Sequence, residues 1–441
     1  MKRIISILSF LAMGLLTFGQ NPISPPGIYI ADPAAHVWKD GRLYVYGSLD
    51  ETTDYYCSHR HHVLSTDNML DWTLHRDVFA SKGANDQVDY SDALLYAPDC
   101  QYHDGSYYLY YTLASPEQVE GVAISESPTG PFVNGLDIDL HGFDQIDPAL
   151  FIDDDGTAYY IWGQFTAKMA KMKPNMMEID SSTIRDNIVT EKEHFFHEGG
   201  FLVKREGIYY FIYAHMGRAG RATCIAYATS DAPMGPYTYG GVIVDNDHSD
   251  PAVWNNHGSI VEFKDQWYVF YHRSTHGSVM MRKACVEPIE FNPDGSITEV
   301  EMTSQGAGPP LSATSKIDAE RACLIYGHVR IEAISENNEA LMQIQPQDAA
   351  GYKYINFGEG VHKLSIRVKP GEAPGKIDLA LGRPWSGSVS TIEVPAKNGS
   401  EEWLTLEAPV SDVSGVHELW LRFSGESNEL FGIDWLQFHK E

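Results

Sequence analysis

Three carboxylic acids stand at one position of a sequence pattern that recurs along the chain. The pattern contains a charged turn that ends in glycine, and the position lies nine residues before that glycine. Four copies place there Asp32, Tyr96, Asp147 and Glu198, and a fifth copy, aligned on Lys264-Asp265, places there His257, to within one residue. Acids that merely begin strands would explain one such residue, but not three in register.

Carboxyl groups that are brought close together repel each other, so the pKa of one of them rises. One protonated acid and one ionised carboxylate are what hydrolysis of a glycosidic bond requires, the first to protonate the leaving oxygen and the second to activate water. If the repeated position converges in space, its residue types therefore favour this chemistry.

The repeated pattern also predicts the elements that position these residues. Each copy is a short strand, the charged turn and a second strand rich in aromatic residues, and the copies span residues 36–46, 100–111, 150–162, 201–213 and 260–271. The turn glycines are 64, 51 and 51 residues apart, a spacing typical of four-stranded propeller blades and too wide for successive sandwich strands. We therefore expect an all-β chain in which residues 21–305 form a five-bladed β-propeller, with the repeated position in a ring around its axis. The fifth copy lacks the glycine, and its turn is expected to be one residue shorter.

Several motifs resemble glycoside hydrolase family 43 over about residues 25–305. They are Ala31-Asp32-Pro33, Tyr96-Ala97-Pro98-Asp99, Ile146-Asp147-Pro148, Glu198-Gly199-Gly200, Asn256-His257 and the aromatic strand that ends in His272. The resemblance implies a five-bladed, inverting enzyme. It implies Asp32 as the general base, Glu198 as the general acid, and Asp147 as the carboxylate that keeps the acid protonated and orients it.

The same resemblance suggests further residues of the site. Tyr96 stands where the family often has Trp and offers a face for sugar stacking, and Asp99 of the same motif is expected to contact substrate. His257 resembles an axial histidine that lies beside a calcium ion or ordered water, or contacts substrate. Gly258 stands where a second His is common. Arg282, a lone arginine in the last blade, is a further candidate substrate contact.

Residues 306–315 are rich in Gly and Pro and predict a linker, after which the blade pattern stops. Residues 316–441 alternate as the strands of a β-sandwich (jelly roll) do, and their last strand resembles carbohydrate-binding module family 6. Glu320 and Asp434 match acids that hold a structural calcium in such modules, and Trp385 could stack on a sugar. Gly432 replaces a common ligand-binding Asn, so we expect this domain to pack on the first and to add little affinity for polysaccharide. A purely structural role stays open.

Composition and the N-terminus limit the partners and the compartment. With 60 acidic and 32 basic residues the net charge is -28, which disfavours nucleic acid and anionic membranes and leaves a neutral plant polysaccharide as the better partner. Residues 1–20 predict a cleavable signal peptide, with no later transmembrane segment and no cysteine before Cys57 for lipid attachment, so a periplasmic or secreted protein is expected. The five cysteines predict buried thiols, with one disulfide open; the oligomeric state is open too.

Together these observations predict an exo-acting inverting glycoside hydrolase of plant cell-wall polysaccharide that needs no cofactor for its chemistry. An α-L-arabinofuranosidase, a β-xylosidase or both is the first hypothesis. A β-1,3-galactanase or an arabinanase of the same family is an alternative, and so is a non-catalytic glycan-binding propeller. The loops that would decide between substrates cannot be interpreted from the sequence.

Overall fold

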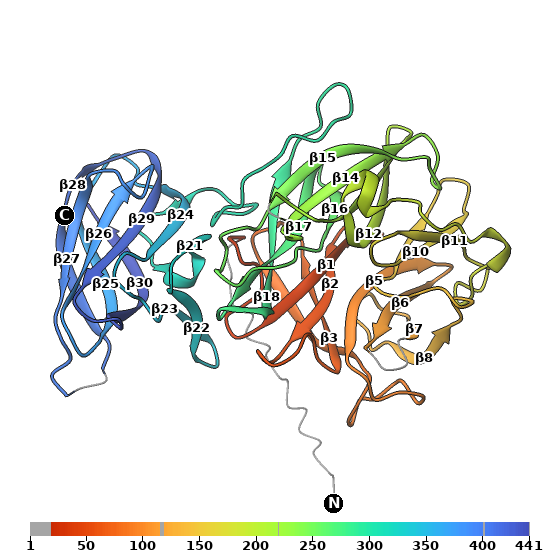
Figure 1. Cartoon of the computed structure of the whole chain (residues 1–441), viewed down its shortest axis with the longest axis horizontal. Helices are drawn as coiled ribbons and strands as arrows, with labels where there is room; N and C mark the ends of the chain where they lie inside the picture. The colour runs from red at the N-terminus through yellow and green to blue at the C-terminus, as the bar shows by residue number, and fades with distance from the viewer. Residues whose placement is uncertain (1–18, 115–118, 219, 400–401, 441) are drawn as a thin grey trace, which may run out of the picture.

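The computed structural model describes residues 19–114, 119–218, 220–399 and 402–440 and is all-β. Figure 1 shows two bodies, one built from the first eighteen strands and one from the remaining twelve. Most of the expected signal peptide lies outside the described residues. Within the described part of the chain, no helix has the length and apolar character that a membrane crossing requires.

The first body, here called the five-sheet domain, consists of five antiparallel sheets of three or four strands. The first three sheets contain β1 (Tyr29–Val37), β2 (Leu43–Asp50), β3 (Arg60–Thr66) and β4 (Trp72–Ala80); β5 (Leu95–His103), β6 (Ser106–Leu113), β7 (Val119–Ser125) and β8 (Val133–Ile138); and β9 (Ala149–Ile152), β10 (Ala158–Trp162) and β11 (Lys168–Lys171). The last two contain β12 (Phe196–Arg205), β13 (Ile208–His215), β14 (Cys224–Ser230) and β15 (Thr238–Asp245); and β16 (Ser259–Phe263), β17 (Gln266–Thr275) and β18 (Ser278–Ile289). Two short helices, η1 (Ser181–Thr183) and α1 (Glu191–His194), lie between β11 and β12.

The first strands of the five sheets follow one another around a common centre. β1 contacts β5, β5 contacts β9, β9 contacts β12, β12 contacts β16, and β16 contacts β1 again. Aromatic side chains pack between neighbouring sheets, as where Tyr110 of β6 meets Tyr160 of β10 edge-on at 5.6 Å between ring centres. Any residue near the start of these first strands therefore lies close to its counterparts in the other sheets.

The turns between the first two strands explain how the repeats align. Two-residue turns join the second, fourth and fifth pairs at 104–105, 206–207 and 264–265, and all six residues have positive φ, as type I′ hairpin turns require. The prediction of a shorter fifth turn was therefore wrong. Lys264 and Asp265 adopt the left-handed conformation (φ 51° and 64°) without a glycine.

The second body is a β-sandwich of two six-stranded sheets. One contains β19 (Leu311–Ser312), β21 (Leu324–Tyr326), β24 (Ala349–Asn356), β26 (Gly375–Leu381), β27 (Ser388–Val394) and β29 (Val416–Gly425); the other contains β20 (Ile317–Asp318), β22 (Arg330–Ser335), β23 (Asn338–Met342), β25 (Val361–Pro370), β28 (Leu404–Val413) and β30 (Phe431–His439). The short helix η2 (Ala319–Arg321) follows β20. A continuous apolar core that includes Leu364, Leu421 and Phe438 lies between the sheets.

The two bodies are packed together rather than tethered. The segment expected as a linker already contributes β19 to the sandwich, and Ser304 N donates to the carbonyl of Lys353. Asn21, near the start of the described chain, donates from its side chain to the carbonyls of Val286 and Thr303 and to the Glu287 carboxylate. Arg321 of the sandwich in turn donates to the Asn21 carbonyl.

A buried ion pair also joins the two bodies. Lys283 of β18 contacts Glu339 of β23, and both side chains are at most 2% exposed. The Lys283 ammonium also lies 5.2 Å from the centre of the Tyr29 ring of β1. Because an uncompensated buried charge is costly, either partner left alone would destabilise the contact.

We expect Glu339→Gln to lower the free energy of unfolding of the whole chain by about 3–5 kcal/mol, since it leaves Lys283 buried without its partner. Burial opposes ionisation of Glu339, but Lys283 outweighs it and lowers the pKa of this carboxyl. The stabilisation is therefore present at neutral pH and lost as the pH falls below about 4.3, the ordinary pKa of Glu. Urea denaturation at pH 7 and pH 4 measures both effects. Glu407→Gln, at the exposed Lys363–Glu407 pair, is the matched control, and an equal loss in both variants would contradict the expectation.

Candidate active site

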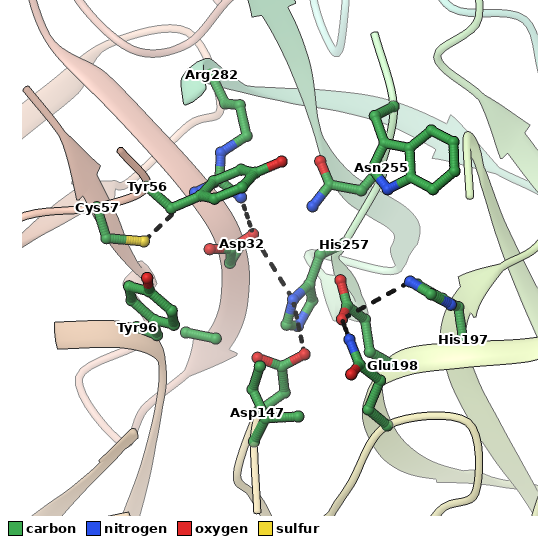
Figure 2. Close-up of a pocket in the computed structure, with 14 residues that line it drawn as sticks. Asp32, Tyr56, Cys57, Tyr96, Asp147, His197, Glu198, Asn255, His257 and Arg282 are labelled. Carbon is green, nitrogen blue, oxygen red and sulfur yellow. Dashed lines mark hydrogen bonds and ion pairs between the residues drawn. The ribbon is translucent and has the colours of Figure 1, made fainter. Parts of the chain in front are cut away.

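A single pocket of about 220 Å³ opens where the first strands converge, and it brings together six of the residues that the sequence nominated. Asp32, Tyr96, Asp147, Glu198, His257 and Arg282 all line it, as Figure 2 shows. The remaining lining residues are Tyr56, Cys57, Ala97, Ile146, Gln164, His197, Trp254 and Asn255. Each of the five sheets, or a segment that joins two of them, contributes a residue to the pocket. Residues at the repeated sequence position therefore lie close together in space.

Irregular backbone aims the three acids at the pocket. The pairing of β1 with β2 is interrupted between Ala31 and Ala34, and that of β12 with β13 between Glu198 and Phe201. Asp32 lies in the first interruption with φ 52°, and Asp147, just before β9, has φ 57°. A bulge turns a side chain away from the regular alternation of a strand, which accounts for acids that leave the sheet and point inward.

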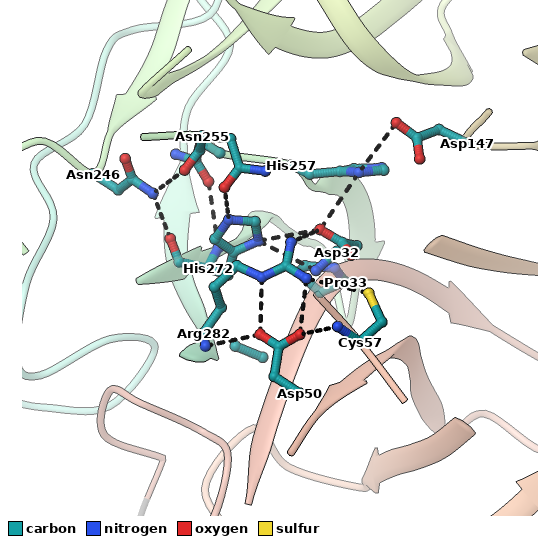
Figure 3. Close-up of polar contacts among 12 residues, drawn as sticks. Asp32, Pro33, Asp50, Cys57, Asp147, Asn246, Asn255, His257, His272 and Arg282 are labelled. Atoms are coloured by element: carbon teal, nitrogen blue, oxygen red, sulfur yellow. Dashed lines mark hydrogen bonds and ion pairs between the residues drawn. The ribbon is translucent and has the colours of Figure 1, made fainter. Parts of the chain in front are cut away.

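Arg282 fixes Asp32 from the last sheet. Its Nη1 donates to Oδ1 of Asp32 at 2.8 Å, while Nε and Nη2 donate to the two oxygens of Asp50, each at 2.9 Å (Figure 3). All three side chains are buried. Burial alone would raise the pKa of Asp32, but the Arg282 guanidinium outweighs it, and that pKa falls to about 2. Asp32 is therefore ionised at neutral pH.

Two histidines beside Asp32 are neutral. Nδ1 of His272 accepts the backbone N–H of Asp32 at 3.2 Å, so its proton resides on Nε2, which faces Oδ1 of Asn255 at 3.3 Å. Burial and the nearby Arg282 lower the pKa of His272 to about 3. Burial likewise lowers the pKa of His257, whose Nδ1 lies 3.6 Å from Asp32 and 3.8 Å from Asp147. The positive charge near Asp32 thus comes from Arg282.

Asp147 and Glu198 form the other half of the pocket. Burial, followed by the negative charges of Glu198 and Asp32, raises the pKa of Asp147 well above its ordinary value. A raised pKa favours the protonated form of Asp147. The side-chain amide of Gln164 donates to Oε2 of Glu198 at 2.7 Å and orients this carboxyl. Glycosidic hydrolysis requires one ionised carboxylate and a second carboxyl that can give a proton, and the pocket brings three carboxyls together.

Asp99 is not a pocket residue, and its assignment as a substrate contact was wrong. It is 1% exposed, accepts from His36 of β1 at 2.6 Å, and accepts from the backbone N–H of Leu150 in β9 at 2.8 Å. The strand irregularity between Tyr96 and Asp99 turns it away from the pocket. Asp99 instead ties together the first strands of three sheets.

The calcium expected in the sandwich stays a prediction, and its two acids have different surroundings. Asp434 is held by the Arg367 guanidinium at 3.0 Å and by the amide of Asn338 at 2.9 Å. Oε2 of Glu320 is buried without a partner, and burial raises the pKa of this carboxyl to about 8, so it is neutral at pH 7. Across the described ranges, no three His, Cys, Asp or Glu side chains are grouped to hold an ion, His257 included.

The other predictions for the sandwich have separate outcomes. Trp385 is 75% exposed in the loop between β26 and β27 and is not among the residues that line the pocket, so sugar stacking there stays a prediction. Gly432 packs against Met342, whose sulfur would lie 2.5 Å from a Cβ at this position, so a larger residue there requires the Met342 side chain to shift. All five cysteines are buried and free.

Residues outside the repeated position were missed. Tyr56 and Trp254 line the pocket with aromatic surface, and the Arg282 guanidinium lies 4.9 Å from the centre of the Tyr56 ring. Gln164 directly follows the aromatic strand of the third repeat, and this place in the repeat could have identified it as a site residue. Asp50 is the last residue of β2, and the other repeats have no acid at the matching position, so the repeated pattern did not reveal it.

Comparison with known proteins agrees with this geometry. Residues 20–297 match Glycosyl hydrolases family 43, and residues 318–440 match Carbohydrate binding module (family 6). A protein from Thermoclostridium stercorarium named xylosidase/arabinosidase is 29% identical, with 92% of this chain and 96% of the relative covered. A protein from Bacillus subtilis named arabinoxylan arabinofuranohydrolase is 28% identical, with 92% and 90% covered.

Solved structures extend the likeness to both bodies. The crystal structure of a family 43 arabinoxylan arabinofuranohydrolase from Bacillus subtilis, in complex with cellotetraose, superposes with a TM-score of 0.54 at 26% identity and covers 96% of this chain and 99% of its own. A β-xylosidase/α-arabinofuranosidase from a compost metagenome, in complex with xylotriose, has a TM-score of 0.54 at 29% identity and covers 64% of this chain and 98% of its own.

Gly199 offers a test of how tightly the pocket is packed. Its φ is 65°, and a Cβ there would come within 2.8 Å of the His257 ring, whereas Gly207 in the following turn has φ 83° and an empty surrounding. We expect Gly207→Ala to cost about 1–2 kcal/mol through the left-handed backbone alone. Gly199→Ala should lower the free energy of unfolding by more and displace the His257 ring in a crystal structure. Equal losses with an unmoved ring would contradict this.

Proposed function

The chain belongs to glycosyl hydrolase family 43, and on this basis we propose that it releases terminal α-L-arabinofuranosyl or β-D-xylosyl units from arabinoxylan-type plant polysaccharide. It is a glycoside hydrolase, and the chemistry of two carboxyl groups requires no cofactor. Relatives aligned over nine-tenths of the chain are named for arabinose and xylose removal. The observation that carries the proposal is one pocket in which Asp32, held ionised by Arg282, lies with the two further carboxyls Asp147 and Glu198.

We further propose that the five sheets are the blades of a five-bladed β-propeller with the pocket on its axis. The cyclic contacts of the first strands support this. A pocket of about 220 Å³ has room for about seven waters, a size suited to one sugar unit rather than to a segment of polysaccharide. The exposed face of Trp254 beside it suits stacking of a sugar that remains outside.

In the proposed mechanism, Asp32 orients a water and accepts its proton as the water oxygen bonds to the anomeric carbon. Glu198 gives its proton to the leaving oxygen as the glycosidic bond breaks, and the anomeric centre inverts. A carboxylate with a pKa of about 2 is a weak base, but little deprotonation of water is needed when the sugar already resembles an oxocarbenium ion. Asp147 keeps the proton within its pair with Glu198, and Gln164 orients that acid.

The proposal includes export, as the N-terminal twenty residues predict, and a supporting role for the sandwich. The buried Lys283–Glu339 pair lies one residue along β18 from Arg282, on the opposite face of the strand. Because neighbouring residues of a strand point to opposite faces, the sandwich supports the strand from which Arg282 reaches Asp32.

Aryl glycosides test the function directly. We expect the protein to release the aryl group from aryl α-L-arabinofuranoside, aryl β-D-xyloside or both, and to release free pentose from arabinoxylan without oligosaccharides as early products. Aryl β-D-galactoside serves as the control substrate and should remain intact. Absence of release from both pentosides would contradict the proposal and favour a glycan-binding role.

Two variants test the assigned roles. Asp32→Asn should abolish turnover with any leaving group, since no base remains to activate water. Glu198→Gln should lower turnover of natural glycosides by about 10²–10⁴-fold and that of aryl glycosides with good leaving groups far less, because these need little protonation. Steady-state kinetics on both substrate types measures the difference, and proton NMR of early products should show inversion. A retained anomeric configuration, or equal losses on both substrates, would overturn the assignment.

A further inference from the structure

Asp147 enters the pocket from a stretch of backbone that its own sheet does not hold. Ile146 and Asp147 have φ angles of 113° and 57°, in the left-handed half of conformational space that residues other than glycine seldom occupy. Both precede β9, so no strand partner fixes them. Such conformations persist only where the surrounding structure holds them in place.

Two side chains of the second sheet hold this stretch. Glu120 of β7 and Thr112 of β6 are directly paired across the two strands. Oε1 of Glu120 accepts the backbone N–H of Ile146 at 2.9 Å, and Oγ1 of Thr112 accepts the next one, that of Asp147, at 3.2 Å. On the other side, the Ile146 carbonyl accepts from the backbone N–H of Gly163 at 2.8 Å. The N–H and the carbonyl of Ile146 and the N–H of Asp147 are thus all hydrogen-bonded, which fixes the backbone from which the Asp147 side chain projects.

Glu120 is a costly residue to place here. Its side chain is fully buried, its Oε2 accepts the Tyr160 hydroxyl, and Lys168 is the cation that acts on it. Burial raises the pKa of Glu120 to about 7, so the carboxyl is neutral in about half of the molecules at neutral pH. In either state Oε1 can accept the Ile146 N–H, and the support persists across this change.

We propose that Glu120 is a positioning residue for Asp147, which together with Thr112 holds two successive backbone N–H groups and so sets the direction in which the Asp147 carboxyl enters the pocket. This inference rests on the proposed function, in which Asp147 and Glu198 share a proton. Without Glu120 the Ile146 N–H loses its acceptor. The backbone of Ile146 and Asp147 can then relax toward the extended conformation of the strand β9 that follows. The Asp147 carboxyl would then turn away from Glu198.

Substitution of Glu120 separates this role from a general loss of stability. Glu120→Ala should lower kcat on arabinoxylan by about 10–100-fold, as a misplacement of about 1 Å does, with KM little changed because Asp147 acts on the acid rather than on the sugar. Glu120→Gln keeps a carbonyl oxygen in the place of Oε1 and should restore kcat to near the original value. Thr112→Val keeps the shape of the side chain but removes the acceptor for the Asp147 N–H, so it should also lower kcat. This variant tests the same role if Glu120→Ala folds poorly.

Glu287→Ala is the matched control. Glu287 is also a buried carboxyl of the five-sheet domain, but its partners are Thr303, Tyr271 and Asn21, and it does not line the pocket. This variant should lose stability while the folded fraction keeps its kcat. A crystal structure of Glu120→Ala should show φ of Ile146 below zero.

The outcomes are distinct. If the unaltered protein hydrolyses neither pentoside, the proposed function fails, while the crystal structure still decides whether Glu120 holds the Ile146–Asp147 backbone. If the protein is active and Glu120→Ala retains both kcat and the left-handed backbone, the inference is overturned. It is equally overturned if Glu287→Ala lowers kcat of the folded fraction as much as Glu120→Ala does.

Discussion

The buried guanidinium of Arg282 is the interaction on which the site depends. It comes from the last sheet of the five-sheet domain and binds one carboxylate from each of the first two strands, so it connects the two ends of the cycle of sheets and charges the pocket at once. Removal of Arg282 would leave two buried carboxylates without their counter-charge, at a cost of about 3–5 kcal/mol. Because the neighbouring histidines are neutral, Arg282 is the cation that keeps Asp32 ionised, while burial and the nearby carboxylates raise the pKa of Asp147.

Placement of the acids combines a regular scaffold with local departures from regularity. The first strands supply a cyclic frame, but an unbroken strand would alternate its side chains between two faces and aim few of them along the common centre. The interruptions after Ala31 and Glu198, and the left-handed residues before β9, redirect three acids into one space. Each departure has its own support: His272 receives the Asp32 N–H, His257 packs on Gly199, and the second sheet holds Asp147.

The repeated pattern allowed the sequence to predict the all-β class and the meeting of Asp32, Tyr96, Asp147, Glu198 and His257, because register within a hairpin is a local property. The sandwich was predicted separately, from the alternation of residues 316–441. The repeated pattern could not predict Asp50 or Glu120, since these belong to strands whose acids have no counterpart in the other repeats and whose partners are distant in sequence. Asp99 failed for a related reason: its motif fixes where it lies along β5, whereas the irregularity beside it decides which way it points. Asp434 was assigned by motif alone, and a motif does not reveal the Arg367 that neutralises it.

The position of Asn21 has a consequence for the order in which the protein acquires its structure. Its side chain is satisfied only by groups at residues 286, 287 and 303, and its carbonyl by Arg321, more than 260 residues further along the chain. Asn21 must therefore remain unpaired until the segment 286–321 has been synthesised. Contacts of such sequence separation slow folding and prolong the exposure of unpaired strand edges. The first sheet can form early as hairpins, but the cycle of sheets closes only when the last one arrives, so assembly of the pocket is among the final events of folding.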